Sequence, residues 1–167
     1  MNSEYRSNTK KQLFVLLFPC ACILVAFFAL CCRVYKTEGT SMLPTIEEHS
    51  YVVAIKYREI ERGDIIAFKN DERTAIKRVI ALPKDEIEIT EDGEVKVNGT
   101  VLKESYVKTE TYGEELTYPY EVPENSYFVL GDNRENSLDS RYRTIGPVKQ
   151  DEILGKVIFS LYPPKLF

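Results

Sequence analysis

Apolar positions in this chain fall into one long run, followed by many short ones. Between Leu13 and Cys32 there are 20 consecutive residues without a charged side chain, LFVLLFPCACILVAFFALCC. A helix of that length, at about 1.5 Å per residue, spans the ~30 Å hydrocarbon core of a bilayer. A buried core helix is the alternative, but the run lacks the polar stripe of an amphipathic helix. We therefore expect a transmembrane anchor at residues 13–32, preceded by a tail at residues 1–12.

The same run differs from a removable signal peptide. Its apolar stretch exceeds the usual h-region of about 7–15 residues, and no Ala-x-Ala site follows it. Positively charged side chains flank the run on both sides: Arg6, Lys10 and Lys11 before it, Arg33 and Lys36 after it. This modest bias favours a cytoplasmic N-terminus. The rest of the chain is then expected outside the cytoplasm, on a single-pass protein of the cell membrane.

Beyond the anchor, the pattern changes to short apolar and β-branched runs separated by Gly, Pro and Asp, which is typical of strands. The runs that predict strands are Tyr51–Lys56, Asp64–Lys69, Thr74–Leu82, Glu86–Thr90, Glu94–Val97, Tyr127–Leu130 and Ile153–Tyr162. Asp92-Gly93 and Asn98-Gly99 are strong hairpin turns. We expect a mostly β, antiparallel-sheet domain over residues 37–167. It would carry a small β insertion at residues 85–124, of which 104–124 form a long loop.

The amino-acid composition excludes some classes of function. The chain has 22 Lys and Arg against 26 Asp and Glu, a net charge of -4. That balance argues against a nucleic-acid-binding protein, which would present a basic face. All four cysteines lie in or at the end of the anchor: Cys20, Cys22, Cys31 and Cys32. The body therefore has no cysteine for a disulfide or a metal site, and its single histidine disfavours a zinc hydrolase.

Candidate chemistry first occurs at residues 39–45, GTSMLPT, just beyond the anchor. Gly39 permits unusual backbone angles and Pro44 fixes a turn, so Ser41 could be presented on a shaped loop. The alternative is an ordinary turn in which Ser and Thr side chains cap the local backbone.

A second candidate lies at residues 74–83, TAIKRVIALP. In a strand, Lys77 would share one face with Ala75, Val79 and Ala81, and Arg78 would share the other with Ile76, Ile80 and Leu82. A lysine on an apolar face is desolvated, so its pKa falls from about 10.4 and it can act as a neutral base. The alternative is an edge strand with snorkelling charges.

The third candidate is the polar loop GDNRENSLDSR at residues 131–141, which follows an apolar strand. Functional groups often gather at such strand ends, and its Asp and Arg side chains could pair bidentately. A solvated surface loop is the alternative.

Elimination then selects among known nucleophile systems. A Ser-His-Asp triad would need His49, which sits in an expected exposed turn. No carboxylate pair stands out for sugar hydrolysis. The remaining pair is Ser41 with Lys77, because a neutral lysine can deprotonate a serine hydroxyl.

The anchor and the three segments, in this order, resemble the bacterial type I signal peptidases, most closely the short, single-anchor, Gram-positive type. The resemblance implies a membrane-bound serine endopeptidase that removes signal peptides from exported proteins at the outer face of the membrane. It implies that Ser41 is the nucleophile, Lys77 the general base, and Ser137 a serine that orients the lysine. Asp139 with Arg141, and Asp132 with Arg78, would form structural pairs.

Two positions depart from the family pattern. Gly39 stands where some relatives have a serine that donates a second hydrogen bond to the oxyanion. Lys84 stands in Pro83-Lys84-Asp85, where the family usually has Pro-Gly-Asp.

The expected substrate is the signal peptide of a preprotein, bound extended against strand edges. Met42, Ile46 and Ile76 are expected to line shallow pockets for the small residues that the family prefers before the cut. The expected partners are this peptide and the lipid bilayer, with no metal or organic cofactor. Two alternatives are a self-cleaving repressor-type protease, which would carry a DNA-binding head, and a catalytically silent membrane-tethered β module.

Overall fold

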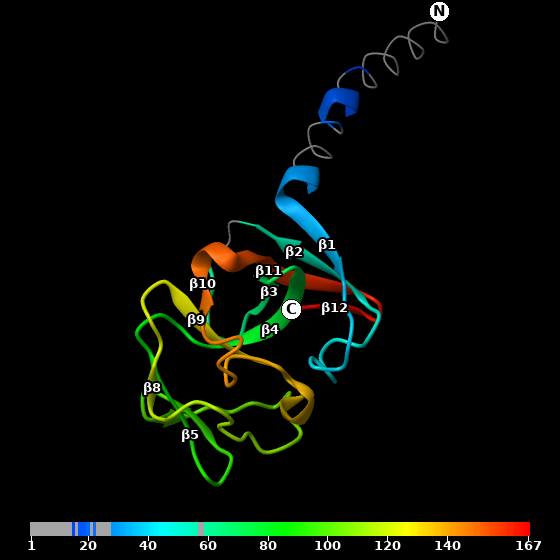
Figure 1. Ribbon diagram of the computed structural model, residues 1–167. Helices are drawn as coiled ribbons and strands as arrows, with labels where there is room; N and C mark the ends of the chain where they lie inside the picture. The colour runs from blue at the N-terminus through cyan, green and yellow to red at the C-terminus, as the bar shows by residue number, and fades with distance from the viewer. Residues whose placement is uncertain (1–14, 16, 21, 23–27, 57–58) are drawn as a thin grey trace, which may run out of the picture. The chain divides into compact units, whose positions relative to one another are not determined.

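The computed structural model describes residues 15, 17–20, 22, 28–56 and 59–167, which belong to two units, Met1–Cys32 and Arg33–Phe167 (Figure 1). In the first unit, the described residues up to Cys31 are helical. No helix within the described residues is long and apolar enough to cross a membrane. The expected tail at 1–12, and much of the expected anchor at 13–32, lie outside the described residues.

The second unit is mostly β, as expected. Its main sheet has the strand order β1-β2-β11-β3-β4-β9-β10, with β12 pairing β11. The strands are β1 (Cys32–Lys36), β2 (Tyr51–Ile55), β3 (Ile65–Asn70), β4 (Arg73–Ala81), β9 (Ser126–Leu130), β10 (Val148–Lys149), β11 (Ile153–Leu161) and β12 (Pro164–Leu166). Pairings from β2 through β10 are antiparallel. This unit also has two short 3-10 helices, Arg134–Asn136 and Gln150–Glu152.

All seven expected strands form, each with ends within one or two residues of the expected ends. The strands that sequence analysis did not predict are β1, β7, β8, β10 and β12, which have between two and five residues. So few residues show little alternation, and each of these strands forms by pairing with the edge of a neighbouring strand.

A second sheet, of order β7-β6-β5-β8, lies in sequence between β4 and β9. It comprises β5 (Glu86–Ile89), β6 (Val95–Val97), β7 (Thr100–Val101) and β8 (Tyr120–Glu121). The two expected hairpin turns are present. Gly93, Asn98 and Gly99 have φ values of 80°, 51° and 73°, in the positive region that tight hairpin turns require. Most of the expected loop at 104–124 is irregular, apart from β8.

The insertion shares its core with the main sheet. Ile87 and Val97 from the small sheet pack in one buried cluster with Ile80 of β4 and Phe128 of β9. This continuous apolar contact ties the insertion to the two strands between which it is inserted.

The expected alternation of faces along β4 is wrong after Val79. The pairing of β4 with β9 shifts register between Val79 and Ala81. As a result, Ala81 packs with Ile80 in one cluster, whereas Leu82 packs with Val79 in another. A bulge adds one residue and therefore reverses the faces beyond it, which the residue pattern alone did not reveal.

The turn after β4 places a lysine where the family pattern has glycine. Lys84 has a φ of 70°, in the left-handed region, and its backbone N–H donates to the Val122 carbonyl at 2.9 Å. Its ammonium lies 2.7 Å from Glu124, but both side chains are mostly exposed, so this ion pair adds little. The turn thus keeps its hydrogen bond at the expense of backbone strain.

We predict that Lys84→Gly raises the free energy of unfolding by about 0.5–1 kcal/mol, because glycine adopts this φ without strain. Lys84→Ala is the matched control, since it removes the same ion pair but keeps the strain. Urea unfolding followed by circular dichroism measures both variants. A Lys84→Gly variant less stable than Lys84→Ala would contradict this explanation.

Candidate active site

Ser41 lies in a loop between β1 and β2 whose two ends are tied together. Thr37 donates its N–H to the Ser50 carbonyl at 2.8 Å, and its hydroxyl donates to the Glu47 carbonyl at 2.9 Å. The Ser50 hydroxyl in turn donates to the carbonyl of Tyr162, just beyond β11. Both ends of the loop are therefore fixed to each other and to the sheet.

Apolar side chains of the same loop pack against the main sheet and also hold the loop in place. Met42 and Ile46 are buried, and the Ile46 N–H donates to the Met42 carbonyl at 2.9 Å. Both pack in one cluster with Ile76 of β4. This packing places the loop that carries Ser41 against the strand that carries Lys77.

Lys77 and Ser41 meet at hydrogen-bond distance. The Lys77 ammonium donates to Ser41 Oγ at 2.7 Å and to the Ile76 carbonyl at 3.2 Å. Burial lowers the pKa of Lys77 from 10.5 to about 8, an effect that the negative charges of Asp139 and Asp132 partly oppose. A substantial fraction of the amine is therefore neutral at slightly alkaline pH, as a general base requires.

Asn133 fixes the backbone at the serine. Its N–H donates to the Ser41 carbonyl at 3.0 Å, and its side-chain amide donates to the Thr40 carbonyl at 3.1 Å. Sequence analysis placed Asn133 in a candidate segment but gave it no role, because a contact to a loop more than 90 residues away leaves no local pattern.

The loop 131–141 takes part in the two expected ion pairs, one within the loop and one with Arg78 of β4. Arg78 contacts the two Asp132 oxygens at 2.8 and 2.6 Å, and Arg141 contacts those of Asp139 at 2.8 and 3.0 Å. Asp139 also accepts the Gly131 N–H at 3.0 Å. Because these carboxylates are buried and bidentately paired, they hold the loop in one conformation.

The close approach of Ser137 and Ser41 explains why residue 131 is glycine. A Cβ at this position would lie 2.2 Å from the Ser137 hydroxyl and 2.6 Å from the Ser41 carbonyl oxygen, so only glycine fits. Ser137 is buried, and its hydroxyl has no hydrogen-bond partner among the described residues. The Lys77 bonds given above do not include Ser137, so its expected orienting role stays a prediction.

The chain is similar to several known proteins. Residues 10–162 match the family "Signal peptidase, peptidase S26". The chain belongs to this family. Signal peptidase I S of Bacillus subtilis is 33% identical, with 98% of this chain and 96% of that protein covered. Signal peptidase I of Bacillus licheniformis is 34% identical at the same coverage. A crystal structure of a signal peptidase I from Enterococcus faecalis is 35% identical with a TM-score of 0.51, covering 59% of this chain and 97% of that one.

Family membership confirms the expectation of a type I signal peptidase, a serine peptidase that removes signal peptides from exported preproteins. His49, the alternative base, lies in an exposed turn of this signal peptidase, as expected. Within the described part of the chain, no group of three or more His, Cys, Asp or Glu side chains could hold a metal ion.

The signal peptidase has a cavity of about 190 Å³ beside the Ser41–Lys77 pair. Residues from 36–46 and from 70–77 line it, and Met42, Ile46 and Ile76 are among them. One wall is β4. There, β3 pairs with residues 73–78, but the pairing of β9 with β4 begins only at Arg78. The edge of β4 from Arg73 to Lys77 is therefore not covered by β9.

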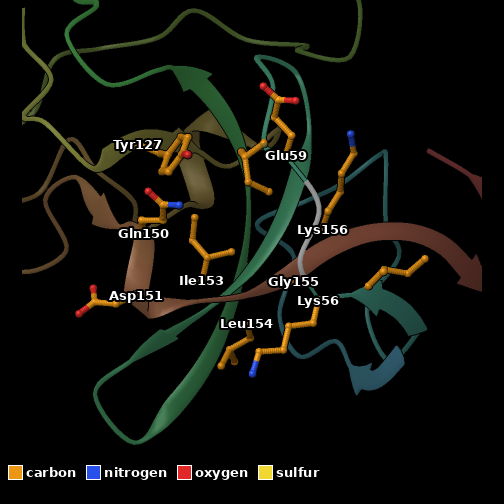
Figure 2. A pocket seen from close by; sticks show the side chains of 11 residues that line it. Lys56, Glu59, Tyr127, Gln150, Asp151, Ile153, Leu154, Gly155 and Lys156 are labelled. Carbon is orange, nitrogen blue, oxygen red and sulfur yellow. The ribbon is translucent and has the colours of Figure 1, made fainter. Parts of the chain in front are cut away.

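A larger cavity, of about 350 Å³, lies elsewhere (Figure 2). Tyr127, Gln150, Ile153 and Lys156 contribute to its walls, but neither Ser41 nor Lys77 does. None of the side chains expected to act in peptide cleavage borders this cavity.

The buried lysine leads to a stability prediction with a definite sign. Below about pH 8 the folded protein holds a desolvated Lys77 ammonium, and the burial of this charge lowers the free energy of unfolding by its full amount. Between about 8 and 10.5 the unfolded chain binds more protons, so stability rises with pH. We predict that Lys77→Met raises the free energy of unfolding at pH 7 by on the order of 2–3 kcal/mol.

Thermal unfolding of the wild type and of Lys77→Met, measured from neutral to alkaline pH, tests this. The gap between the two should close as the pH passes through the titration range of Lys77. Replacing exposed Lys69 of β3 by Met provides a matched control, which should show no such gap. A Lys77→Met variant that unfolds before the wild type at pH 7 would be inconsistent with a desolvated ammonium.

Proposed function

We propose that this signal peptidase cleaves preproteins with Ser41 as the nucleophile and Lys77 as the general base. The 2.7 Å contact between Lys77 Nζ and Ser41 Oγ is the observation that carries the proposal. The reacting form is the one in which Lys77 is neutral. Ser41 Oγ then attacks the carbonyl carbon of the scissile bond while its proton passes to Lys77 Nζ.

Lys77 first passes the proton from Ser41 to the leaving group. Lys77 gives it to the leaving amine as the peptide bond breaks, which leaves an acyl ester on Ser41. Water then attacks the ester as Lys77 takes one of its protons. Lys77 returns this proton to Ser41 Oγ as the ester bond breaks, and the acid that is released, the C-terminus of the signal peptide, ionises in solution. Every transfer uses one amine, so no metal or organic cofactor is required.

Ser137 is proposed to orient the base. A lysine ammonium has three hydrogen-bond donors, and two are occupied by Ser41 and the Ile76 carbonyl. The unpartnered Ser137 hydroxyl is proposed as the third acceptor. This bond would restrict rotation of Nζ and would give the buried hydroxyl a partner.

The oxyanion donor is proposed to be the Ser41 backbone N–H. Gly39 offers no hydroxyl, and its N–H already donates to Glu48 Oε1 at 3.2 Å. The enzyme thus differs from relatives that have a serine two residues before the nucleophile.

The substrate is proposed to bind extended along the uncovered edge of β4. The free edge between Arg73 and Lys77 borders the active-site cavity and can pair with a peptide backbone. Met42, Ile46 and Ile76 would then face the residues before the cut. Because these side chains leave a cavity of only about 190 Å³, small residues fit best.

We also propose the membrane arrangement implied by the sequence: a cytoplasmic tail at residues 1–12, an anchor at 13–32 and a catalytic domain at 37–167 outside the cytoplasm, with 85–124 as its smaller part. Large exposed apolar side chains on β1, β2, β11 and β12 support a location at the lipid surface; they are Val34, Tyr51, Leu161 and Leu166. The direct contact between Ser41 and Lys77 argues against a catalytically silent module.

The test is cleavage of a secretory precursor with a small-x-small site, in detergent or liposomes. We predict that Ser41→Ala and Lys77→Ala lower cleavage by at least about 10⁴-fold, the scale on which removal of a triad member acts, and that His49→Ala changes it less than twofold. Circular dichroism checks that each variant is folded. Normal cleavage by folded Lys77→Ala, or loss of cleavage in folded His49→Ala, would overturn the assignment.

A further inference from the structure

Part of the insertion reaches the loop that holds Ser41. Asn133, which binds the Ser41 and Thr40 carbonyls, lies between Asp132 and Arg134 in sequence. Each of these neighbours belongs to a buried polar cluster that includes side chains from residues 104–111. We call this segment of the insertion the clasp.

The first contact of the clasp is with Arg134, whose side chain is 1% exposed. Arg134 donates to Glu104 Oε1 at 2.6 Å and to the Thr111 hydroxyl. Its Nε donates to the Gly131 carbonyl at 3.1 Å, and its own carbonyl accepts from Arg141 at 2.7 Å. The guanidinium therefore joins the clasp to the backbone on the N-terminal side of Asn133.

The second contact is with Arg78, next to the general base in β4. Its guanidinium lies over the Tyr106 ring, 4.0 Å from the centroid, while it also holds Asp132 bidentately. The Tyr106 hydroxyl donates to Glu104 Oε1 at 2.7 Å, so the same carboxylate serves both contacts. The two halves of the clasp are thus coupled through Glu104.

We propose that Glu104 is a positioning residue: through Arg134 and Tyr106 it fixes the Asp132–Arg134 backbone, and Asn133 then sets the position of Ser41. This inference rests on the proposed role of Ser41. A buried guanidinium without its carboxylate is costly, so the loop would move to solvate Arg134 once the charge of Glu104 is lost. A displacement of the nucleophile by about 1 Å is enough to lower a rate by up to a hundredfold.

Cleavage kinetics of the full chain in detergent test the proposal. Glu104→Gln is expected to lower kcat between about tenfold and a hundredfold, with KM within about twofold of the wild-type value, because substrate contacts remain. Glu110→Gln is the matched control: it neutralises an exposed carboxylate of the same segment, whose partner is the Tyr112 hydroxyl, and should leave both constants unchanged.

A double variant separates positioning from general destabilisation. If Glu104 acts through Asn133, Glu104→Gln should cost a smaller factor in kcat in an Asn133→Ala background than in the wild type. Multiplicative effects of the two changes, in folded proteins, would overturn the proposal. So would wild-type kcat in folded Glu104→Gln.

Tyr106→Phe decides the matter if Glu104→Gln does not fold. It keeps the ring beneath Arg78 and removes only the hydrogen bond to Glu104, and we expect a fall in kcat of about threefold to tenfold at unchanged KM. Unchanged kcat in folded Tyr106→Phe would then refute the coupling. A wild type that cleaves, with an inactive Ser41→Ala, keeps the proposed function independent of this result.

Discussion

The burial of the Lys77 amine against Ser41 Oγ is the interaction on which the rest of the site depends. An ammonium withdrawn from water is unfavourable, and the protein lowers the pKa of Lys77 to about 8 rather than pairing it directly with a carboxylate. The apolar packing of the Ser41 loop and the paired strands around β4 must supply the free energy that keeps this amine buried. Part of the folding free energy therefore offsets the cost of burying the Lys77 amine, which is common where a side chain must act as a base.

The carboxylates near Lys77 are arranged so that they do not cancel the lowering of its pKa by burial. Asp132 and Asp139 raise the pKa of Lys77, but each is bound bidentately by its own arginine. Their charges are thus largely balanced locally, and burial remains the larger influence. The same ion pairs order the loop that carries Asn133, so one set of contacts serves both electrostatics and geometry.

Sequence reasoning succeeded where the signal is local. Alternation and turn residues predicted the long strands, and a lysine flanked by apolar residues indicated the side chain that meets Ser41. It failed where a structural feature depends on residues that are far apart in the sequence. The β-bulge after Val79 depends on the partner strand β9, and the contact of Glu104 with Arg134 joins residues 30 positions apart. Charges in a Tyr- and Glu-rich stretch are typical of a solvated loop, and only the fold reveals that the Glu104 side chain is 10% exposed and paired with Arg134.

The most direct test of the central claim is the titration of Lys77 itself. Spectra of the full chain with isotope-labelled lysine, recorded from about pH 6 to 11, would follow each ε-group through the range in which lysines titrate. The signal missing from Lys77→Met identifies the residue. The account predicts a midpoint near 8, well below that of the exposed lysines. A midpoint at the ordinary value of 10.5 would contradict it, because Lys77 would then be protonated whenever the enzyme works.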